Sequence, residues 1–173
     1  MKNGFFPIAC ATPPLRVADC TYNAEQIISL TRKATKNGSK LVVFPELCIT
    51  GYTCGDLFLQ KILLDSAKDS LIKIAKATEN LDITAVVGLP YVAEQTLYNC
   101  AAVVNGGHIK GLVPKLNIPN YAEFYEVRHF TAGKNEVTYV NINGEEIPFG
   151  ANILFKTDAC EDCLLYTSDA ADE

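Results

Sequence analysis

Short, fully apolar runs alternate along the chain with longer segments whose apolar residues recur at helical spacing. The apolar runs predict buried strands, at residues 5–11, 40–44 and 83–89. The periodic segments predict amphipathic helices, at residues 22–37 and 61–78. Asp19 or Thr21 can cap the first helix, and Asn37-Gly38 can end it. Pro7 favours a sheet edge or a bulge for the first strand, and Pro90 is expected to close the third.

Two further apolar runs, residues 97–104 and 108–113, surround Asn105-Gly106-Gly107. Because Asn and Gly tolerate the positive φ of primed turns, this segment predicts a hairpin. Helices between parallel strands, followed by a hairpin, predict an α/β fold with a mixed sheet covered on one side by helices. We find no internal repeat, and no linker before residue 156.

Glu46 directly follows one of the buried runs, in the stretch LVVFPELCITGYTCGD. Pro45 ends the strand ladder, and the apolar residues Leu47, Cys48 and Ile49 come next. An ionised carboxylate in apolar surroundings is costly unless it is paired, and burial makes a carboxyl group hold its proton more tightly. A general base near neutral pH needs that property. The alternative is a glutamate that reaches solvent from a loop.

Residues 114–130, PKLNIPNYAEFYEVRHF, are dense in aromatic and charged side chains and follow no helical or strand period. In this loop Lys115 follows Pro114 at a strand end, just as Glu46 follows Pro45. Sites form at the strand ends of α/β sheets, so we expect Glu46 and Lys115 to lie close in space at the ends of adjacent strands. A lysine beside a glutamate would keep the carboxylate ionised and could stabilise a developing oxyanion. The alternative is an ordinary surface loop with a solvated lysine.

The composition indicates which class of protein the chain belongs to. The 173 residues suffice for one domain with a sizeable core, and 49% hydrophobic with 20% charged residues indicates a globular chain. A net charge of −5 argues against a nucleic-acid partner. The first residues do not resemble a signal peptide, and no apolar run is long enough to span a bilayer. Seven cysteines without a regular framework favour the reducing cytoplasm, and the lone Cys160-x-x-Cys163 does not predict a metal site.

Several long motifs, in the family's order, resemble the nitrilase superfamily of carbon-nitrogen hydrolases. They are FPELCITGYTCGDLF, GLPY with LYNCA, GGHIKGLVPKLNIPNYAEFYEVRHF and PFGANILF. The Gly-Tyr-x-x-x-Asp-Leu extension and the Pro-Asn-Tyr-x-Glu-Phe-Tyr-Glu loop resemble, more narrowly, the amino-terminal glutaminase domain of glutamine-dependent NAD synthetases. The resemblance implies an αββα sandwich that carries a Glu-Lys-Cys triad.

The resemblance also implies roles for individual side chains. Glu46 matches the family's general base, and Lys115 matches the lysine that stabilises the tetrahedral intermediate. Tyr121 matches a position that helps to bind glutamine. Glu126 resembles a second glutamate that orients the lysine, with Glu123 as the alternative.

Cys160 is the candidate nucleophile, because Cys160-Glu161-Asp162 copies the family's C-E-D. The residues before it, 156–159, are polar where the family has a buried strand, so a fortuitous match is the alternative. The ending CLLYTSDAADE offers no apolar face. We therefore expect residues 1–155 to form a partial glutaminase domain, incomplete at its carboxyl end, and residues 156–173 to form an atypical tail foreign to the fold.

The function implied by the resemblance is hydrolysis of the glutamine amide through an acyl-enzyme. In the intact parent, the ammonia would supply a carboxy-terminal synthetase domain that amidates deamido-NAD with ATP and Mg; this chain shows no signature of that domain. The implied partners are glutamine, the synthetase domain and further copies in a homo-oligomer, with no nucleic acid, no membrane and no cofactor for the glutaminase domain. The alternatives are a stand-alone amidase acting on another small amide and a catalytically inactive fragment. Because no strand supports Cys160, we expect poor or no glutamine hydrolysis by this chain.

Overall fold

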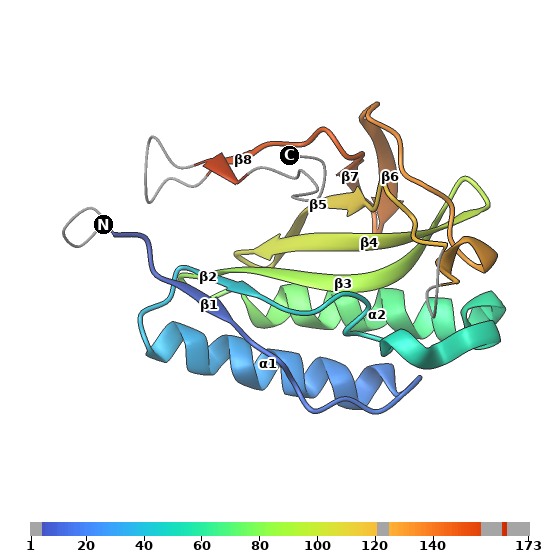
Figure 1. Ribbon diagram of the computed structural model, residues 1–173. Coiled ribbons are helices and arrows are strands. Elements are labelled where there is room, and N and C mark those ends of the chain that lie inside the picture. The colour runs from blue at the N-terminus through green and yellow to red at the C-terminus, as the bar shows by residue number, and fades with distance from the viewer. Residues whose placement is uncertain (1–4, 121–124, 157–163, 166–173) are drawn as a thin grey trace.

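A seven-stranded mixed sheet forms the centre of the molecule (Figure 1). The computed structural model describes residues 5–120, 125–156 and 164–165. The strand order is β1-β2-β3-β4-β5-β7-β6. The strands are β1 (Ile8–Cys10), β2 (Leu41–Val43), β3 (Thr84–Ala93), β4 (Thr96–Asn105), β5 (His108–Pro114), β6 (Thr138–Ile142) and β7 (Glu145–Phe149). A separate two-stranded sheet pairs β8 (Phe155–Lys156) with β9 (Leu164–Leu165).

The sheet is mixed, as the alternation of elements predicts. Strands β1, β2 and β3 run parallel, β3, β4 and β5 pair antiparallel, and β7 is parallel to β5 and antiparallel to β6. The predicted hairpin joins β4 to β5, where Asn105 pairs with His108. Gly106 (φ 57°) and Gly107 (φ 86°) form its two-residue turn, since both positions require positive φ.

Both long helices, α1 (Cys20–Lys36) and α2 (Lys61–Ala77), lie on the same face of the sheet (Figure 1). Their bounds agree closely with the predicted segments. Asp19 caps α1 by accepting a hydrogen bond from the Tyr22 backbone N–H (3.0 Å), and Asn37 is the C-cap. Two short 3-10 helices complete the described elements, η1 (Tyr52–Leu59) and η2 (Glu126–Arg128).

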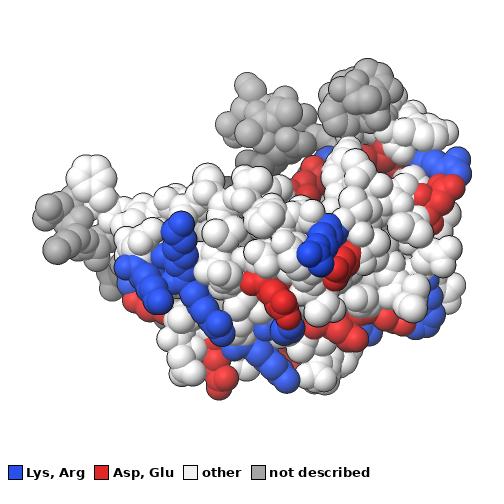
Figure 2. Space-filling view, turned by 90° about the horizontal axis from the view of Figure 1, so that it is seen from below, with Lys and Arg blue, Asp and Glu red and all other residues white. Residues whose placement is uncertain are grey.

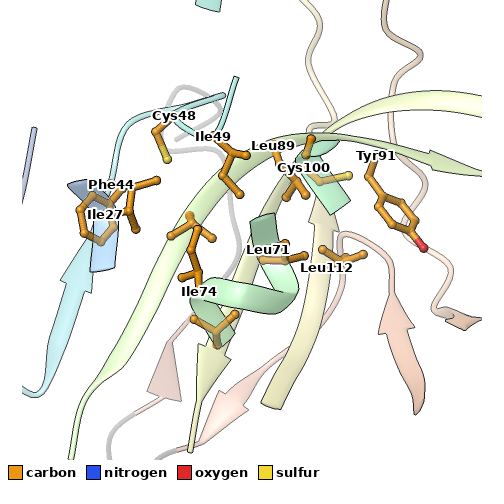
Figure 3. Packing of buried hydrophobic residues seen from close by; sticks show 14 of the residues in the cluster. Ile27, Phe44, Cys48, Ile49, Leu71, Ile74, Leu89, Tyr91, Cys100 and Leu112 are labelled. Atoms are coloured by element: carbon orange, nitrogen blue, oxygen red, sulfur yellow. The ribbon is translucent and has the colours of Figure 1, made fainter. Parts of the chain in front are cut away.

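The main core fills the space between these helices and the sheet (Figure 3). Side chains from α1 and α2 meet side chains from β3, β4 and β5, and nearly all are fully buried. Those labelled in the figure include Ile27, Leu71, Ile74, Leu89, Cys100 and Leu112. Burying each large aliphatic side chain contributes roughly 1.5–3 kcal/mol, so the core gives the strand ends a rigid base.

Pro90 does not close its strand, contrary to the sequence prediction. Strand β3 continues to Ala93, and Pro90 lies opposite Asn99 of β4. The ladder between β2 and β3 has already ended at Val86, so β3 has a strand neighbour on one side only at this point. A missing N–H is tolerated at such an edge. The first strand is an edge strand as Pro7 suggested, because β1 pairs with β2 alone.

The face of the sheet away from the helices is here called the helix-free face. Because side chains alternate between the two faces of a strand, the residues between the core residues of β3 and β4 point to this face. They include Val86 and Gly88 of β3, which lie opposite Val103 and Ala101 of β4. The helix-free face carries half-buried apolar side chains, Val43, Val86, Ala101 and Val113. It is thus an apolar surface with less cover than the helix-packed face.

Charge is unevenly distributed over the opposite, helix-covered side. Lys and Arg gather on part of that side (Figure 2). The groove between α1 and α2 is lined by Arg32, Lys33, Lys36 and Lys73 together with Glu25. Lys33 and Lys36 lie in the last turn of α1, where cations interact favourably with the helix dipole. Among the described residues, no helix combines the length and apolarity needed to cross a bilayer.

Candidate active site

Glu46 lies in a turn that follows β2 and packs on Gly88 of β3. The Ile49 N–H donates to the Gly88 carbonyl (3.1 Å), and Leu47 adopts a positive φ of 52° within the turn. A Cβ on Gly88 would lie 2.9 Å from Glu46 Cα and would also clash with the Leu47 nitrogen. The close approach of backbone to backbone therefore requires glycine at position 88.

The side chain of Glu46 is not buried, so the prediction of a carboxylate inside an apolar collar is wrong. Its side chain is 40% exposed, whereas Leu47, Cys48 and Ile49 are buried. Figure 3 shows Cys48 and Ile49 among the core side chains. Because the turn directs the three apolar residues into the core, Glu46 is left at the surface of the site. The buried carboxylate is Glu126, at 6% exposure.

Lys115 brings the two carboxylates together. It follows Pro114, the last residue of β5, and its backbone N–H donates to the Asn99 carbonyl (2.8 Å). Its Nζ donates to Glu46 Oε1 at 3.0 Å and to both carboxylate oxygens of Glu126 at 3.2 Å. The predicted proximity of Glu46 and Lys115 is confirmed. Their strands are not adjacent, however: β3 and β4 lie between β2 and β5, and the side chains meet over them.

The surroundings favour the charged form of Lys115. Burial by itself lowers the pKa of this ammonium group, but the hydrogen bonds and charges of Glu46 and Glu126 outweigh burial and raise the pKa above its usual value. Lys115 is therefore a cation at neutral pH. Its side chain keeps 27% exposure, so it can still donate to an incoming oxygen.

Glu126 opens η2 and accepts hydrogen bonds from side chains of three other segments of the chain. Tyr52, at the start of η1, donates its hydroxyl to Glu126 Oε1 (2.8 Å). Lys115 donates to both oxygens, and Asn99 Nδ2 donates to Oε2 at a longer 3.4 Å. These donors compensate the burial of the carboxylate. The position predicted to support the lysine is thus in contact with it, while Glu123 lies outside the described residues.

Sequence reasoning missed two residues of this cluster, Asn99 and Tyr52. Asn99 is 3% exposed and donates through Nδ2 to Glu46 Oε1. A signal existed, since asparagine is depleted from strands and Asn99 interrupts the apolar run of β4. Tyr52 stands in the Gly-Tyr-x-x-x-Asp-Leu motif, but the motif gives no indication of its partner 74 positions away.

A second set of contacts fixes η2 on η1. Arg128 donates through Nε and Nη2 to the two carboxylate oxygens of Asp56 at 2.9 and 3.0 Å, and His129 Nε2 lies 3.2 Å from Asp56 Oδ1. The Phe58 and Phe130 rings pack with centroids 5.0 Å apart. The Arg128 hydrogen bonds, followed by that of His129, lower the pKa of Asp56 to about 2. These contacts hold the turn that presents Glu126.

The remaining predicted site residues, Tyr121 and Cys160, lie outside the described residues, so their roles stay predictions. Two buried cysteines that the structure describes do not fit the nucleophile. Burial raises the pKa of Cys48 to about 12 and raises the pKa of Cys100 as well, so both are neutral thiols at pH 7. Within the described ranges, no three His, Cys, Asp or Glu side chains are grouped to hold a metal ion.

Comparisons with known proteins identify the family of the chain. The carbon-nitrogen hydrolase family matches residues 8–170. The glutamine-dependent NAD(+) synthetase of Mycobacterium tuberculosis is 35% identical over 154 residues, which are 89% of this chain and 23% of that protein. The synthetase of Thermotoga maritima is 36% identical over 162 residues, 94% of this chain and 26% of that protein. The chain thus spans about a quarter of the length of these curated relatives.

Solved structures give the same picture at the level of the fold. A glutamine-dependent NAD(+) synthetase from Cytophaga hutchinsonii superposes with a TM-score of 0.82 at 33% identity, covering 87% of this chain and 26% of that one. An amidase from Nesterenkonia sp. superposes with a TM-score of 0.64 at 21% identity, covering 84% of this chain and 55% of that one. The second likeness concerns the fold alone.

Proposed function

Because the chain belongs to the carbon-nitrogen hydrolase family, we propose that its Glu46–Lys115–Glu126 cluster serves hydrolysis of the side-chain amide of glutamine. The observation that carries the proposal is the position of Lys115 Nζ, which lies within 3.2 Å of carboxylate oxygens of both Glu46 and Glu126. The choice of glutamine is supported by the similarity to synthetases that are named glutamine-dependent.

In the proposed reaction, Glu46 acts as general base and takes the proton of a cysteine thiol. The thiolate attacks the amide carbon, and Lys115 donates a hydrogen bond to the oxyanion of the tetrahedral intermediate. Glu46 returns the proton to the departing nitrogen, and ammonia leaves a thioester. Water, deprotonated by Glu46, then releases glutamate and restores the thiol. Glu126 acts on this chemistry only through Lys115.

Cys160 is our candidate for the thiol, and Tyr121 for a contact to glutamine. We propose that residues 1–155 belong to a glutaminase domain and that residues 156–173 form an atypical tail. In a longer parent protein, the ammonia would pass to a synthetase domain that consumes ATP with Mg to make NAD from its deamido form, and the parent would be a homo-oligomer. No step through ATP or Mg is assigned to the residues of this chain.

The test is ammonia release from glutamine by the purified chain, combined with labelling by a glutamine-analogue electrophile and mass spectrometry. We expect slow turnover, because a polar run precedes Cys160, and we expect the label on Cys160. Glu46→Gln should lower the rate by about 10²–10⁴-fold, the usual contribution of a general base. Glu25→Gln, which removes an exposed glutamate of α1, is the matched control and should change little.

Three results would contradict parts of the proposal. Hydrolysis that survives Glu46→Gln would remove Glu46 as the base. Hydrolysis that survives Cys160→Ala would remove Cys160 as the nucleophile. Preference for a small amide other than glutamine would favour a stand-alone amidase, and the absence of both label and ammonia would favour an inactive chain.

A further inference from the structure

We propose that Asn99 is a positioning residue of this site, whose amide NH₂ bridges Glu46 and Glu126 and thereby leaves Oε2 of Glu46 as the oxygen that takes the proton. The assignment of a proton-accepting oxygen rests on the proposed amide hydrolysis. The bridge itself rests on the contacts and burial of Asn99, and it can be tested without turnover.

Asn99 reaches both carboxylates from the middle of the sheet. Asn99 pairs with Pro90 of β3, and Ala101, two residues further along β4, pairs with Gly88. Residues two apart in a strand point to the same face of the sheet. The Asn99 side chain therefore points to the helix-free face, on which the Glu46 turn packs. Its Nδ2 donates to Glu46 Oε1 and, at 3.4 Å, to Glu126 Oε2. Because an ionised carboxylate only accepts hydrogen bonds, the NH₂ end of the amide must face the two glutamates.

The charge balance of the cluster explains why a neutral donor is suited to this position. Glu46 and Glu126 carry two negative charges, and Lys115 supplies one positive charge. A second cation would compete with Lys115 for the carboxylates, whereas an apolar residue would remove one hydrogen-bond donor from each of them. The asparagine NH₂ group supplies two hydrogens and no net charge, so it reduces the repulsion between the carboxylates and leaves the ion pairs of Lys115 intact.

The same contacts distinguish the two oxygens of Glu46. Oε1 accepts from both Asn99 and Lys115. Oε2 accepts no hydrogen bond from any residue that the structure describes. The side chain is 40% exposed, so this second oxygen can meet a thiol or a water molecule. Asn99 thus fixes the rotation of the carboxylate that the proposed reaction needs.

The test replaces the amide by a carboxyl of the same shape. The new carboxyl of Asn99→Asp would face Glu46 and Glu126, with Lys115 and Tyr52 as the other titratable groups of the described cluster. Asn105→Asp is the matched control. It lies on the same strand, but its amide donates to Ile83 O and Thr84 Oγ1 rather than to a carboxylate. Unfolding equilibria of both variants and of the wild type are measured in denaturant from pH 4 to pH 8.

At low pH the new carboxyl is protonated and can donate one hydrogen bond, as the amide does. At higher pH it must ionise between two carboxylates or retain a proton that the unfolded chain releases. We therefore expect the unfolding constant of Asn99→Asp, relative to the wild type, to rise about 10–100-fold between pH 4 and pH 8. The rise should be several-fold smaller for Asn105→Asp. It should also be smaller for Asn99→Asp combined with Glu46→Gln than for Asn99→Asp alone, because one of the two facing carboxylates is then neutral.

A pH-independent loss of stability, or equal rises for Asn99→Asp and Asn105→Asp, would overturn the bridge. For the positioning role, Asn99→Ala should lower kcat for amide hydrolysis at least tenfold with little change in KM, since the carboxylate would lose its orientation rather than its charge. An unchanged kcat would overturn that role. If no amide is hydrolysed by the wild type, the proposed function fails while the stability titration still decides the bridge.

Discussion

The surroundings of Lys115 determine its charge. Two carboxylates hold it charged, and the more buried of them, Glu126, is in turn held by Tyr52 and Asn99. The raised pKa means that this stabilisation is fully present below the unfolded lysine pKa of about 10.4 and is lost as pH rises through the folded value. The cluster should therefore stay intact at neutral pH.

Replacing Glu126 tests this dependence directly. Glu126→Gln removes one of the two charges that raise the pKa of Lys115, so that pKa should fall, as measured by NMR of isotope-labelled lysine side chains. Glu126→Ala also removes the acceptor that Tyr52, Lys115 and Asn99 share and should destabilise the fold by about 1–3 kcal/mol in denaturant titrations. Glu25→Gln, remote from Lys115, should change neither quantity. An unchanged Lys115 pKa in Glu126→Gln would contradict the assigned ion pair.

At the scale of single residues, the sequence predicted Glu46, Lys115 and Glu126, because a proline at each strand end and the family motifs mark their positions. It did not predict that Glu46 is exposed, since apolar neighbours along the chain do not show which way a turn directs each side chain. It also gave no partner for Asn99, because that contact depends on how a turn after β2 lies over a strand about 50 residues later.

Among the elements, the turn after β2 depends most on a distant position, Gly88 of β3. Gly88→Ala would set a methyl group against the backbone of Glu46 and Leu47, which cannot rotate away. We expect a loss of about 1–3 kcal/mol, typical of overpacking, together with displacement of Glu46 from Lys115. Gly111→Ala is the control, because its new methyl group would first meet the movable ring of Phe155. Equal losses in the two variants, from thermal or denaturant unfolding, would argue against the special role of Gly88.

The contact between η1 and η2 makes a separate, pH-dependent prediction. The depressed pKa of Asp56 means that its pairing stabilises the fold above the unfolded value of about 3.9 and is lost as pH falls through about 2. Asp56→Asn should therefore speed amide hydrogen exchange at His129 and Phe130 near neutral pH, and the difference from the wild type should vanish near pH 2. Asp65→Asn, which removes an exposed acid of α2, should leave those two amides unchanged.

The elements themselves were predicted with uneven success. Both long helices and the β4–β5 hairpin follow from periodicity, a cap and a glycine turn. Strands β6 and β7 were missed, although Asn143 (φ 55°) and Gly144 (φ 87°) form the turn that joins them. Their exposed, polar residues weaken the apolar pattern on which strand prediction depends.

For the molecule as a whole, the order of helices and strands was enough to predict a mixed sheet with helices on one face. The family likeness adds the expectation of a further layer over the helix-free face, as in an αββα sandwich. In the described structure that face carries Val43, Val86, Ala101 and Val113, all only half-buried. A contiguous apolar surface of this kind favours association, whereas single exposed apolar residues do not.

We therefore expect the chain to self-associate through the helix-free face. Sedimentation velocity should show a weight-average mass that increases with protein concentration, and the double variant Val86→Thr/Val113→Thr should reduce that increase, because threonine keeps the β-branched shape while adding a hydroxyl. Ile62→Thr is the matched control: Ile62 is 79% exposed on α2, on the helix-covered side, and its replacement should not alter association. A monomer at all concentrations with cooperative two-state unfolding would contradict this expectation. Equal effects of the two replacements would place the association elsewhere, since only the valines lie on the face that a second layer would cover.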